Sequence, residues 1–515
     1  MQRSYTKNYF KIYFWQLLSI LLNLLSLMVV IPQLSSHPGI YGIYAICVSS
    51  VIFLSYADLG FMNAGFKFAS EFFARGKQAE ERQIIGLVSF ILLIFVGLFM
   101  ITTLVLSVHP SWLIKGLNDQ GYVRIARQLL VILALFAPMV VLQRALAIIF
   151  GIRLQDFIYQ RVQMVVNLCK IVSVFFFYRS GHSNIVGYFL FGQCLTAVGL
   201  LTGFGIAGRR YGIGLKCFAR SIRFSRPLFD EIKPLALSTL FITISWILYY
   251  ELDIFSIARL SGAQAVAFYS IGLTCQSFFR TILGMLFNPF AARFNHFIAM
   301  HDTEGLKRFY QSVICLMLPV VVFPILSIVC LSKPLVYSWV GSGFHESVRL
   351  VQVLAMCNIW GFISYPAGML LIARKEIRKL YVLAIVQPVI FWLGVAVFFS
   401  HFGYEVFAWF QLFAFLISAL VYGWYSKQFL QIDTWKFFKT FILPGFLPAV
   451  LLILGLWSLV GYLPEEKNKI NLILVVAIGG VLSMLAVGIY YLTTPTFRKY
   501  MYTVLQNLRT GRAAG

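Results

Sequence analysis

Long apolar runs constrain this chain more than any other feature of its sequence. About 20 apolar residues in a helix cross the roughly 30 Å hydrocarbon core of a bilayer, and a helix satisfies its own backbone hydrogen bonds there. The sequence therefore predicts an all-α integral membrane protein with about 14 transmembrane helices. The predicted spans lie near residues 11–31, 40–62, 84–108, 126–150, 157–178, 183–206, 235–257, 263–290, 309–332, 347–372, 380–400, 403–424, 438–461 and 469–492.

The composition excludes a large soluble domain. Of the 515 residues, 60% are hydrophobic and 12% are charged, whereas soluble proteins have about 45–50% apolar and about 25% charged residues. The charged fraction is about half of what a water-facing surface needs. A soluble enzyme with a membrane anchor is therefore excluded.

The positive charges predict the orientation of the chain. If the N-terminus is cytoplasmic, 29 of the 42 Lys and Arg residues lie in cytoplasmic segments, nine lie on the opposite side and four lie within spans. The positive-inside rule then predicts that both termini are cytoplasmic and that the number of spans is even. The longest connection, 207–234, is basic. It is expected to be an orientation signal beside anionic lipid headgroups, or else a docking surface for a partner.

Weak internal similarity indicates that the spans form a repeat. The two halves match at an offset of about 225 residues, which predicts two six-helix lobes related by a pseudo-two-fold axis along the membrane normal. The matching segments are LSSHPGIYGIY (34–44) with LSGAQAVAFY (260–269), FMNAGFKF (61–68) with LFNPFAAR (286–293), and GIRLQDFIY (151–159) with ARKEIRKLY (373–381). The predicted parts are an N-terminal lobe (1–206), a basic linker (207–234), a C-terminal lobe (235–424), and two extra helices with a cytoplasmic tail (425–515).

The sequence has no motif for ATP hydrolysis or zinc-dependent hydrolysis. It contains neither GxxxxGK[ST] nor HExxH, the patterns that hold nucleotide phosphates and a catalytic zinc ion. No large external loop carries paired carboxylates. We expect a protein that is not an enzyme, with no catalytic residue, no metal site and no cofactor.

Four basic residues lie within the predicted spans, where an ionised side chain is costly and marks a candidate functional site. Lys170 and Arg280 lie near the middle of their spans, and Arg144 and Arg161 lie within about two turns of the cytoplasmic end. One interpretation is a hydrated cationic cleft that binds an anionic substrate. The alternatives are pairing of Lys170 and Arg280 with buried carboxylates or carbonyl groups, and snorkelling of Arg144 and Arg161 to the interface.

Three acidic residues in the spans are candidates for ion coupling. Glu251 and Asp253 close the seventh span, and Asp58 lies near the inner end of the second. A carboxylate there could bind Na⁺ or H⁺. Alternatively, Glu251 and Asp253 pair with Arg259, and Lys67 neutralises Asp58.

Two segments carry a resemblance to known proteins: PQLSSHPGIYGIYAICVSSVIFLSYADLGFMNAGFKFASE (32–71) and YYELDIFSIARLSGAQAVAFYSIG (249–272). The first is similar to the first hairpin of bacterial polysaccharide transporters, and the second to their seventh-helix signature. Both resemble the Wzx-type flippases of the multidrug/oligosaccharidyl-lipid/polysaccharide exporter superfamily. Ala267 and Phe268 depart from the pattern, which more often has Gly and then a small or aliphatic residue. The two extra helices resemble those of the fourteen-helix branch with the lipid II flippases, where the pair is associated with the lipid tail.

The resemblance implies a cationic central cavity, onto which Lys170 and Arg280 would map by depth. Our hypothesis is a flippase that works by ion-coupled alternating access in a bacterial inner membrane. The substrate would be a polyprenyl-pyrophosphate-linked oligosaccharide, moved from the cytoplasmic to the outer leaflet for export of lipopolysaccharide or another polysaccharide. The partners implied are this substrate, membrane lipid, Na⁺ or H⁺ and other polysaccharide assembly proteins, with no nucleic acid. The alternatives are a MATE-like drug/cation antiporter and a membrane glycosyl polymerase or ligase.

Overall fold

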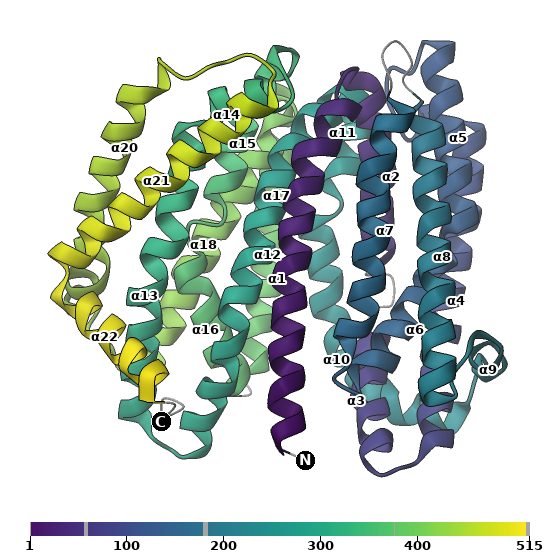
Figure 1. The fold of residues 1–515 in the computed structure, drawn as a ribbon, viewed down its shortest axis with the longest axis horizontal. Coiled ribbons are helices and arrows are strands. Elements are labelled where there is room, and N and C mark those ends of the chain that lie inside the picture. The colour runs from purple at the N-terminus through teal and green to yellow at the C-terminus, as the bar shows by residue number, and fades with distance from the viewer. Residues whose placement is uncertain (1, 56–59, 179–183, 375, 511–515) are drawn as a thin grey trace. The chain divides into compact units, whose positions relative to one another are not determined.

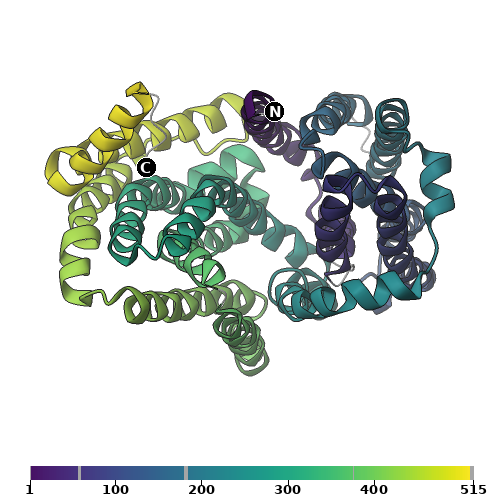
Figure 2. The ribbon, with the colours of Figure 1, turned by 90° about the horizontal axis from the view of Figure 1, so that it is seen from below.

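The computed structural model describes residues 2–55, 60–178, 184–374 and 376–510, and these residues form helices and turns without a strand. The chain divides into two compact units, Met1–Ala267 (unit 1) and Phe268–Gly515 (unit 2). Figure 2 shows many of the long helices of unit 1 nearly end-on, as expected for helices that cross a bilayer. The all-α membrane fold is thus confirmed.

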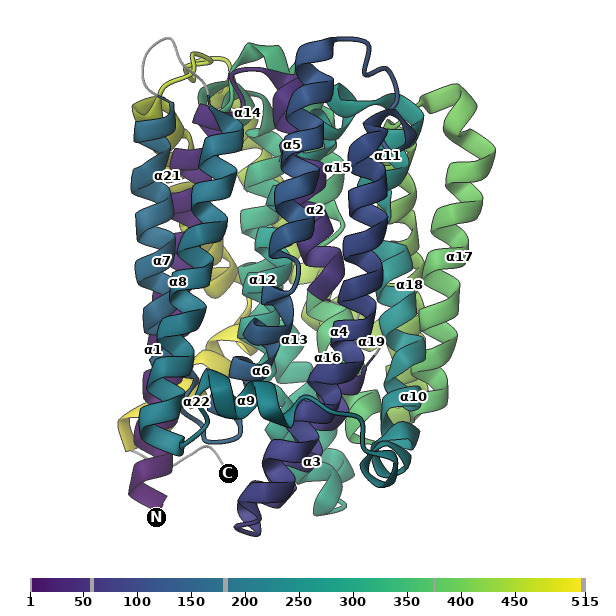
Figure 3. The same ribbon diagram turned by 90° about the vertical axis from the view of Figure 1, so that its right-hand side faces the viewer.

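Unit 1 is a bundle built around neighbouring helix pairs (Figure 1). α1 packs along α7, α7 packs along α8, and α4 packs against both α3 and α5; Figure 3 shows α7 and α8 side by side. The elements are α1 (Gln2–Leu34), α2 (Pro38–Ser55), α3 (Phe61–Ala74), α4 (Gln78–Val108), η1 (Pro110–Trp112), α5 (Gln120–Phe136), α6 (Met139–Gly151), α7 (Asp156–Phe177), α8 (Ile185–Tyr211), α9 (Leu215–Ser221), α10 (Arg226–Tyr250) and α11 (Asp253–Ser261).

Unit 2 begins within α12 (Ala263–Ala299), whose first turn belongs to unit 1. α17 packs along α18, and α13 contacts α15, α20 and α21. The remaining elements are α13 (Thr303–Cys330), α14 (Ser332–Trp339), η2 (Ser342–Phe344), α15 (His345–Met356), α16 (Gly361–Ala373), α17 (Ile377–Phe402), α18 (Glu405–Leu430), α19 (Thr434–Phe437), η3 (Phe438–Ile442), η4 (Leu443–Gly445), α20 (Phe446–Val460), α21 (Lys469–Thr493) and α22 (Pro495–Thr510).

Ten helices in the described part of the chain are long and apolar enough to cross a membrane, and two bent helix pairs raise the number to twelve. The protein is therefore a multi-pass membrane protein. The count of about 14 stays a prediction. One predicted span, 40–62, includes residues 56–59, which lie outside the described residues.

The two bent pairs occupy matching places in the predicted repeat. The bend between α5 and α6 is 42°, and the bend between α15 and α16 is 41°. Pro138 lies at the first bend, where it has no backbone N–H to donate and its ring crowds the preceding turn of helix. The second bend has a side-chain bond instead, because the buried Asn358 donates Nδ2 to the carbonyl oxygen of Gln276 over 3.2 Å.

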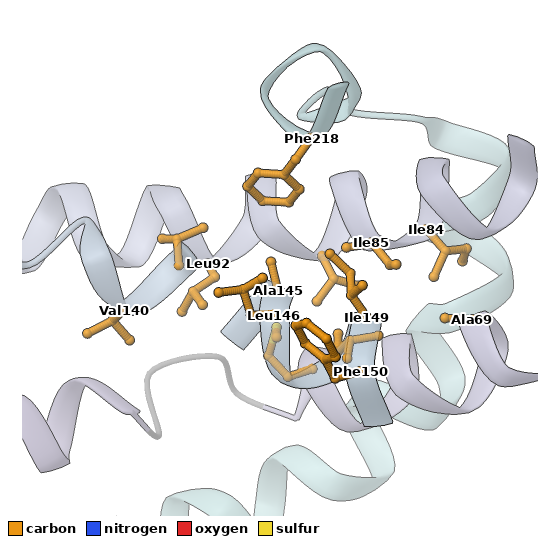
Figure 4. Close-up of a cluster of buried hydrophobic side chains, with 14 of the residues drawn as sticks. Ala69, Ile84, Ile85, Leu92, Val140, Ala145, Leu146, Ile149, Phe150 and Phe218 are labelled. Atoms are coloured by element: carbon orange, nitrogen blue, oxygen red, sulfur yellow. The ribbon is translucent and has the colours of Figure 1, made fainter. Parts of the chain in front are cut away.

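The main apolar core described in unit 1 lies among α3, α4, α6, α8 and α9. Ile85, Leu146 and Phe150 are almost fully buried in it. Figure 4 shows these side chains with Phe218 of α9 pointing toward them. The short helix α9 is therefore part of the fold and does not form a loose connection.

An ion pair is buried beside this core. Arg153 Nη2 lies 2.6 Å from Glu81 Oε1, and the two side chains are 9% and 1% exposed. The Arg153 guanidinium also lies over the rings of Phe73 and Tyr211, 4.8 Å and 4.7 Å from their centroids. Arg153 follows α6, so these contacts join it to α3, α4 and α8. Such a pair needs precise geometry to offset the cost of removing two charges from water.

α10 and α11 belong to unit 1 and pack against its earlier helices. α10 contacts α3 and α11 contacts α2, and a Cβ added at Gly60 would lie 2.1 Å from Thr239 Oγ1. The lobe boundaries at 206/207 and 234/235 remain predictions.

We expect Arg153→Met to lower the thermal unfolding temperature of the purified protein strongly. The substitution leaves the buried Glu81 carboxylate without its cation, which costs about 3–5 kcal/mol in comparable pairs. As a control, Lys67→Met breaks the Lys67–Glu71 pair, whose side chains are 59% and 43% exposed, and should cost about 0–1 kcal/mol. Equal melting of the two variants would contradict the structural role of the buried pair.

Candidate functional site

The four predicted basic residues are divided between the two units. Arg144 lies on α6 and Arg161 and Lys170 lie on α7, all in unit 1, whereas Arg280 lies on α12 in unit 2. A common cleft lined by Lys170 and Arg280 therefore stays a prediction, and the surroundings of each are described within its own unit.

Lys170 has a defined polar partner on the neighbouring helix. Its Nζ donates to Thr196 Oγ1 over 2.8 Å, and Thr196 Oγ1 donates to the carbonyl oxygen of Gly192 over 2.9 Å. Lys170 is half-buried. An ammonium group has three donors, and this bond occupies one of them.

Sequence reasoning missed Thr196. A threonine in a membrane helix is ordinary, and its hydroxyl can bond the carbonyl one turn earlier without any other role. Only the packing of α7 on α8 shows that the same hydroxyl receives the Lys170 ammonium. No sequence motif marks this pairing.

Arg161 is held by aromatic rings. Its guanidinium lies 4.6 Å from the ring centroid of Trp15 on α1 and 5.5 Å from that of Phe157. The side chain is exposed. A guanidinium over a ring face gains cation–π attraction, so Arg161 has both a contact to α1 and open surface. Arg144 is half-buried on α6.

In unit 2, Arg280 belongs to a polar row on α12. Tyr365 of α16 donates its hydroxyl to the carbonyl oxygen of Arg280 over 3.4 Å and stacks on Phe287 at 5.1 Å. One turn before Arg280, Gln276 is buried, and its Nε2 finds no hydrogen-bond partner within the described residues. A buried amide donor of this kind normally meets water or a ligand oxygen.

The two described acidic candidates flank the junction between α10 and α11. Glu251 is 7% exposed and Asp253 is 1% exposed. Asp253 begins α11, and its Oδ1 accepts from the backbone N–H of Ile254 over 2.8 Å. Asp58 lies outside the described residues. Arg259, which the sequence offered as a partner for both carboxylates, donates Nη1 to the carbonyl oxygen of Ser111 over 3.3 Å.

The segment after these carboxylates is clamped to the end of unit 1 opposite the N-terminus. Lys115 donates its backbone N–H to the carbonyl oxygen of Ala258 over 3.0 Å, and its Nζ to that of Leu260 over 3.1 Å. These bonds and the Arg259–Ser111 bond tie α11 to the connection between α4 and α5. We call this set of contacts the α11 clamp.

Beside the α11 clamp, Gly42 permits α2 to approach the start of α12 very closely. A Cβ added at Gly42 of α2 would lie 1.7 Å from the carbonyl oxygen of Ala263, the first residue of α12. Gly42 belongs to the first copy of the repeated motif (34–44), and Ala263 belongs to the second (260–269). The two copies therefore touch each other, and only glycine fits at this contact.

No group of three or more His, Cys, Asp or Glu side chains that could hold a metal ion occurs among the residues that were described. The site chemistry consists of basic, amide and hydroxyl groups, together with two buried carboxylates.

Solved structures show which fold this is. The chain matches a structure described as lipid II flippase MurJ in an inward closed conformation, with a TM-score of 0.68, 12% identity, and coverage of 94% of this chain and 99% of that chain. It also matches an inward-facing MATE-family multidrug resistance transporter of the MOP superfamily, with a TM-score of 0.58, 16% identity, and coverage of 80% and 94%.

A third similar structure is a MOP-superfamily transporter from Pyrococcus furiosus, described as having a binding pocket of reversed polarity (TM-score 0.54, 16% identity, coverage 82% and 94%). No protein-family profile matches the chain, and no curated protein is significantly similar to it in sequence. At these identities the likeness shows the fold alone. The chain has the fold of transporters of the multidrug/oligosaccharidyl-lipid/polysaccharide exporter superfamily.

We expect Gly42→Val to displace the first turn of α12 from α2, because the new side chain meets the Ala263 carbonyl. The measurement is the rate at which a membrane-impermeant maleimide labels Leu260→Cys in a variant without the native cysteines. Labelling should be faster with Gly42→Val. The control is Gly205→Val, because an added Cβ at Gly205 meets nothing within 4 Å; equal rates in both variants would refute the close contact.

Proposed function

We propose that this protein is a flippase for a polyprenyl-pyrophosphate-linked oligosaccharide. It moves the lipid-linked glycan from the cytoplasmic to the outer leaflet of a bacterial inner membrane, for lipopolysaccharide or another exported polysaccharide, and performs no chemistry on it. Transport is by ion-coupled alternating access. The fold shared with a structure described as a lipid II flippase supports this proposal.

The observation that carries the proposal is the presence of basic side chains in apolar helices. Lys170 is half-buried on α7 and oriented by Thr196, and no ion pair of Lys170 occurs among the described residues. A cation kept within a membrane helix at this cost is a functional site by default. A lysine ammonium suits a phosphate as a point charge. The pyrophosphate of the lipid carrier is the part of the substrate that supplies such a charge.

In unit 2, Gln276 and Arg280 of α12 are also groups that can bind a phosphate-bearing substrate. Arg280 can make bidentate hydrogen bonds to a phosphate. The buried Gln276 amide is a donor for an oxygen. The half-buried ring of Tyr365, which stacks on the buried Phe287, is the apolar surface proposed for a sugar ring. We assign the pyrophosphate to Lys170 and Arg280, with Arg144 and Arg161 as further cations near the predicted cytoplasmic end.

The two buried carboxylates are the proposed coupling site. Glu251 and Asp253 lie just before the residues of α11 that form the clamp, so binding of Na⁺ or H⁺ there could change how α11 contacts the connection between α4 and α5. A ligand shifts a conformational equilibrium only through different affinities for its states. If the α11 clamp is closed in one state and open in another, the carboxylates can bind the ion with a different affinity in each state.

The two alternatives fit less well. A drug/cation antiporter shares the fold, but the described mid-helix charges on α7 and α12 are basic and would repel a cationic drug. A glycosyl polymerase or ligase would need a catalytic surface outside the membrane. The connections at the end of unit 1 opposite the N-terminus, such as residues 109–119, are short.

The experiment that tests the function uses a strain that lacks this protein. Polyprenyl-linked oligosaccharides are extracted, and the leaflet that holds them is determined. Accumulation of complete repeat units on the cytoplasmic leaflet is the expected result. Unpolymerised units on the outer leaflet would instead move the assignment to a polymerase or ligase.

We expect Lys170→Ala and Arg280→Ala each to abolish glycan export while folded protein remains in the membrane. Each removes a cation that the proposal places on the pyrophosphate. Export is measured by complementation of the deletion strain, with membrane abundance as the control. Lys67→Ala, at an exposed surface pair, should export normally. Full activity of both site variants would remove Lys170 and Arg280 from the mechanism.

Thr196→Val should reduce export, and Thr196→Ser should restore it. Valine keeps the shape of threonine but cannot accept the Lys170 hydrogen bond, whereas serine keeps the hydroxyl. The comparison uses the same complementation assay at matched protein levels. If valine and serine behave alike, Thr196 does not position Lys170.

A further inference from the structure

The connection between α8 and α10 carries a dense group of positive charges. Within residues 207–234 there are seven basic residues and two acidic ones, Asp230 and Glu231. All seven basic side chains are exposed, and none belongs to an ion pair in the part of the chain that the structure describes. We call this set the basic platform: Arg209, Arg210, Lys216, Arg220, Arg223, Arg226 and Lys233.

Buried aromatic packing holds the basic platform in place. Phe218 of α9 is almost fully buried and lies 5.2 Å, ring to ring, from Phe204 of α8. Ile213, just before α9, is also buried. Figure 4 shows Phe218 directed into the core cluster near Ala145 and Ile149. Lys216 and Arg220 therefore stand on an anchored helix, and the other cations flank it on α8, on α10 and in the connection between α9 and α10.

The end of α9 lies directly on α4. A Cβ added at Gly86 of α4 would lie 1.9 Å from the carbonyl oxygen of Ser221. Arg82, one turn earlier on α4, donates Nη1 to Cys217 Sγ over 3.9 Å. Glycine at position 86 thus sets how closely the basic platform approaches the spans. An orientation signal that acts by charge alone would not need this fit.

Exposed apolar side chains lie among the cations. Phe224 is 52% exposed and lies between Arg223 and Arg226 in sequence, with its ring 6.2 Å from Phe90 of α4 and 5.5 Å from Phe229 of α10. Leu215 at the start of α9 is also exposed. Cations next to a partly exposed aromatic ring are typical of surfaces in the headgroup region of a bilayer.

The basic platform lies at the end of unit 1 where the apolar helices stop. α8 ends at Tyr211 and α10 begins at Arg226, so the connection leaves and re-enters the bundle at that end. Figure 1 shows α9 at the edge of unit 1, beside α8. Lipid headgroups of one leaflet lie at this level of a transmembrane bundle.

We propose that the basic platform is a binding site for anionic phospholipid headgroups. The phosphates bind the cations of α9 and its flanks, and Phe224 and Leu215 contact the acyl-chain boundary. Juxtamembrane cations are attracted to anionic leaflets, and here the fold arranges them on a fixed surface. This inference is independent of the transported substrate.

The experiment titrates the full-length protein, purified in a neutral detergent, with phosphatidylglycerol and with phosphatidylcholine, and counts bound lipids by native mass spectrometry. We expect a preference for phosphatidylglycerol. Lys216→Gln/Arg220→Gln/Arg223→Gln should reduce that preference on the order of tenfold or more. The matched control, Lys436→Gln/Arg498→Gln/Lys499→Gln, removes three exposed cations elsewhere and should keep it.

Gly86→Val tests whether the arrangement of the cations matters in addition to their number. It retains every cation, and therefore the orientation signal, but pushes the Ser221 backbone away from α4. We expect it to weaken the preference for phosphatidylglycerol, and it also serves as the test if the triple variant fails to insert. The proposal is overturned by an unchanged preference in both variants, by equal losses in the basic-platform and control triples, or by full selectivity of Gly86→Val.

Discussion

The buried ion pair of Arg153 and Glu81 is the interaction on which the described arrangement of unit 1 depends. Each group would be unstable alone among apolar side chains, so the pair fixes the distance between the end of α6 and the start of α4. The rings of Phe73 and Tyr211 extend this constraint to α3 and α8. A charge pair in such surroundings has one good geometry.

The fold class was predictable from the sequence because apolar length is a local property. The runs at 84–108 and 309–332 indicate α4 and α13 directly, since a membrane helix needs no distant partner to satisfy its backbone. The bend at α15–α16 was not predictable, because no local residue pattern marks it and the Asn358 bond found there is to α12, about 80 residues earlier. Arg153 falls between the predicted spans 126–150 and 157–178, and nothing local shows that Glu81, 72 residues away, lies beside it.

In the candidate site, too, local features could be predicted from the sequence and contacts between distant residues could not. Lys170 and Arg280 were identifiable because a charge in an apolar run stands out by itself. Thr196 and Gln276 were not, because hydroxyl and amide side chains in membrane helices are common and mostly bond their own backbone. The α11 clamp was equally hidden, since Lys115 contacts backbone carbonyl oxygens that any residue would provide. A charged residue within an apolar run can be recognised from the sequence, whereas a side-chain hydrogen bond to a distant backbone carbonyl cannot.

The two bent helix pairs have a consequence for the history of the chain. The second halves, α6 and α16, are both 13 residues long, and the bends that precede them agree within one degree. One bend has Pro138, and the other has Asn358 bonded to α12. If both helix pairs descend from one duplicated ancestor, the bend angle was retained while the residues at the bend changed. Selection after the duplication then acted on the direction of the helix, and different residues now stand at the bend in each copy.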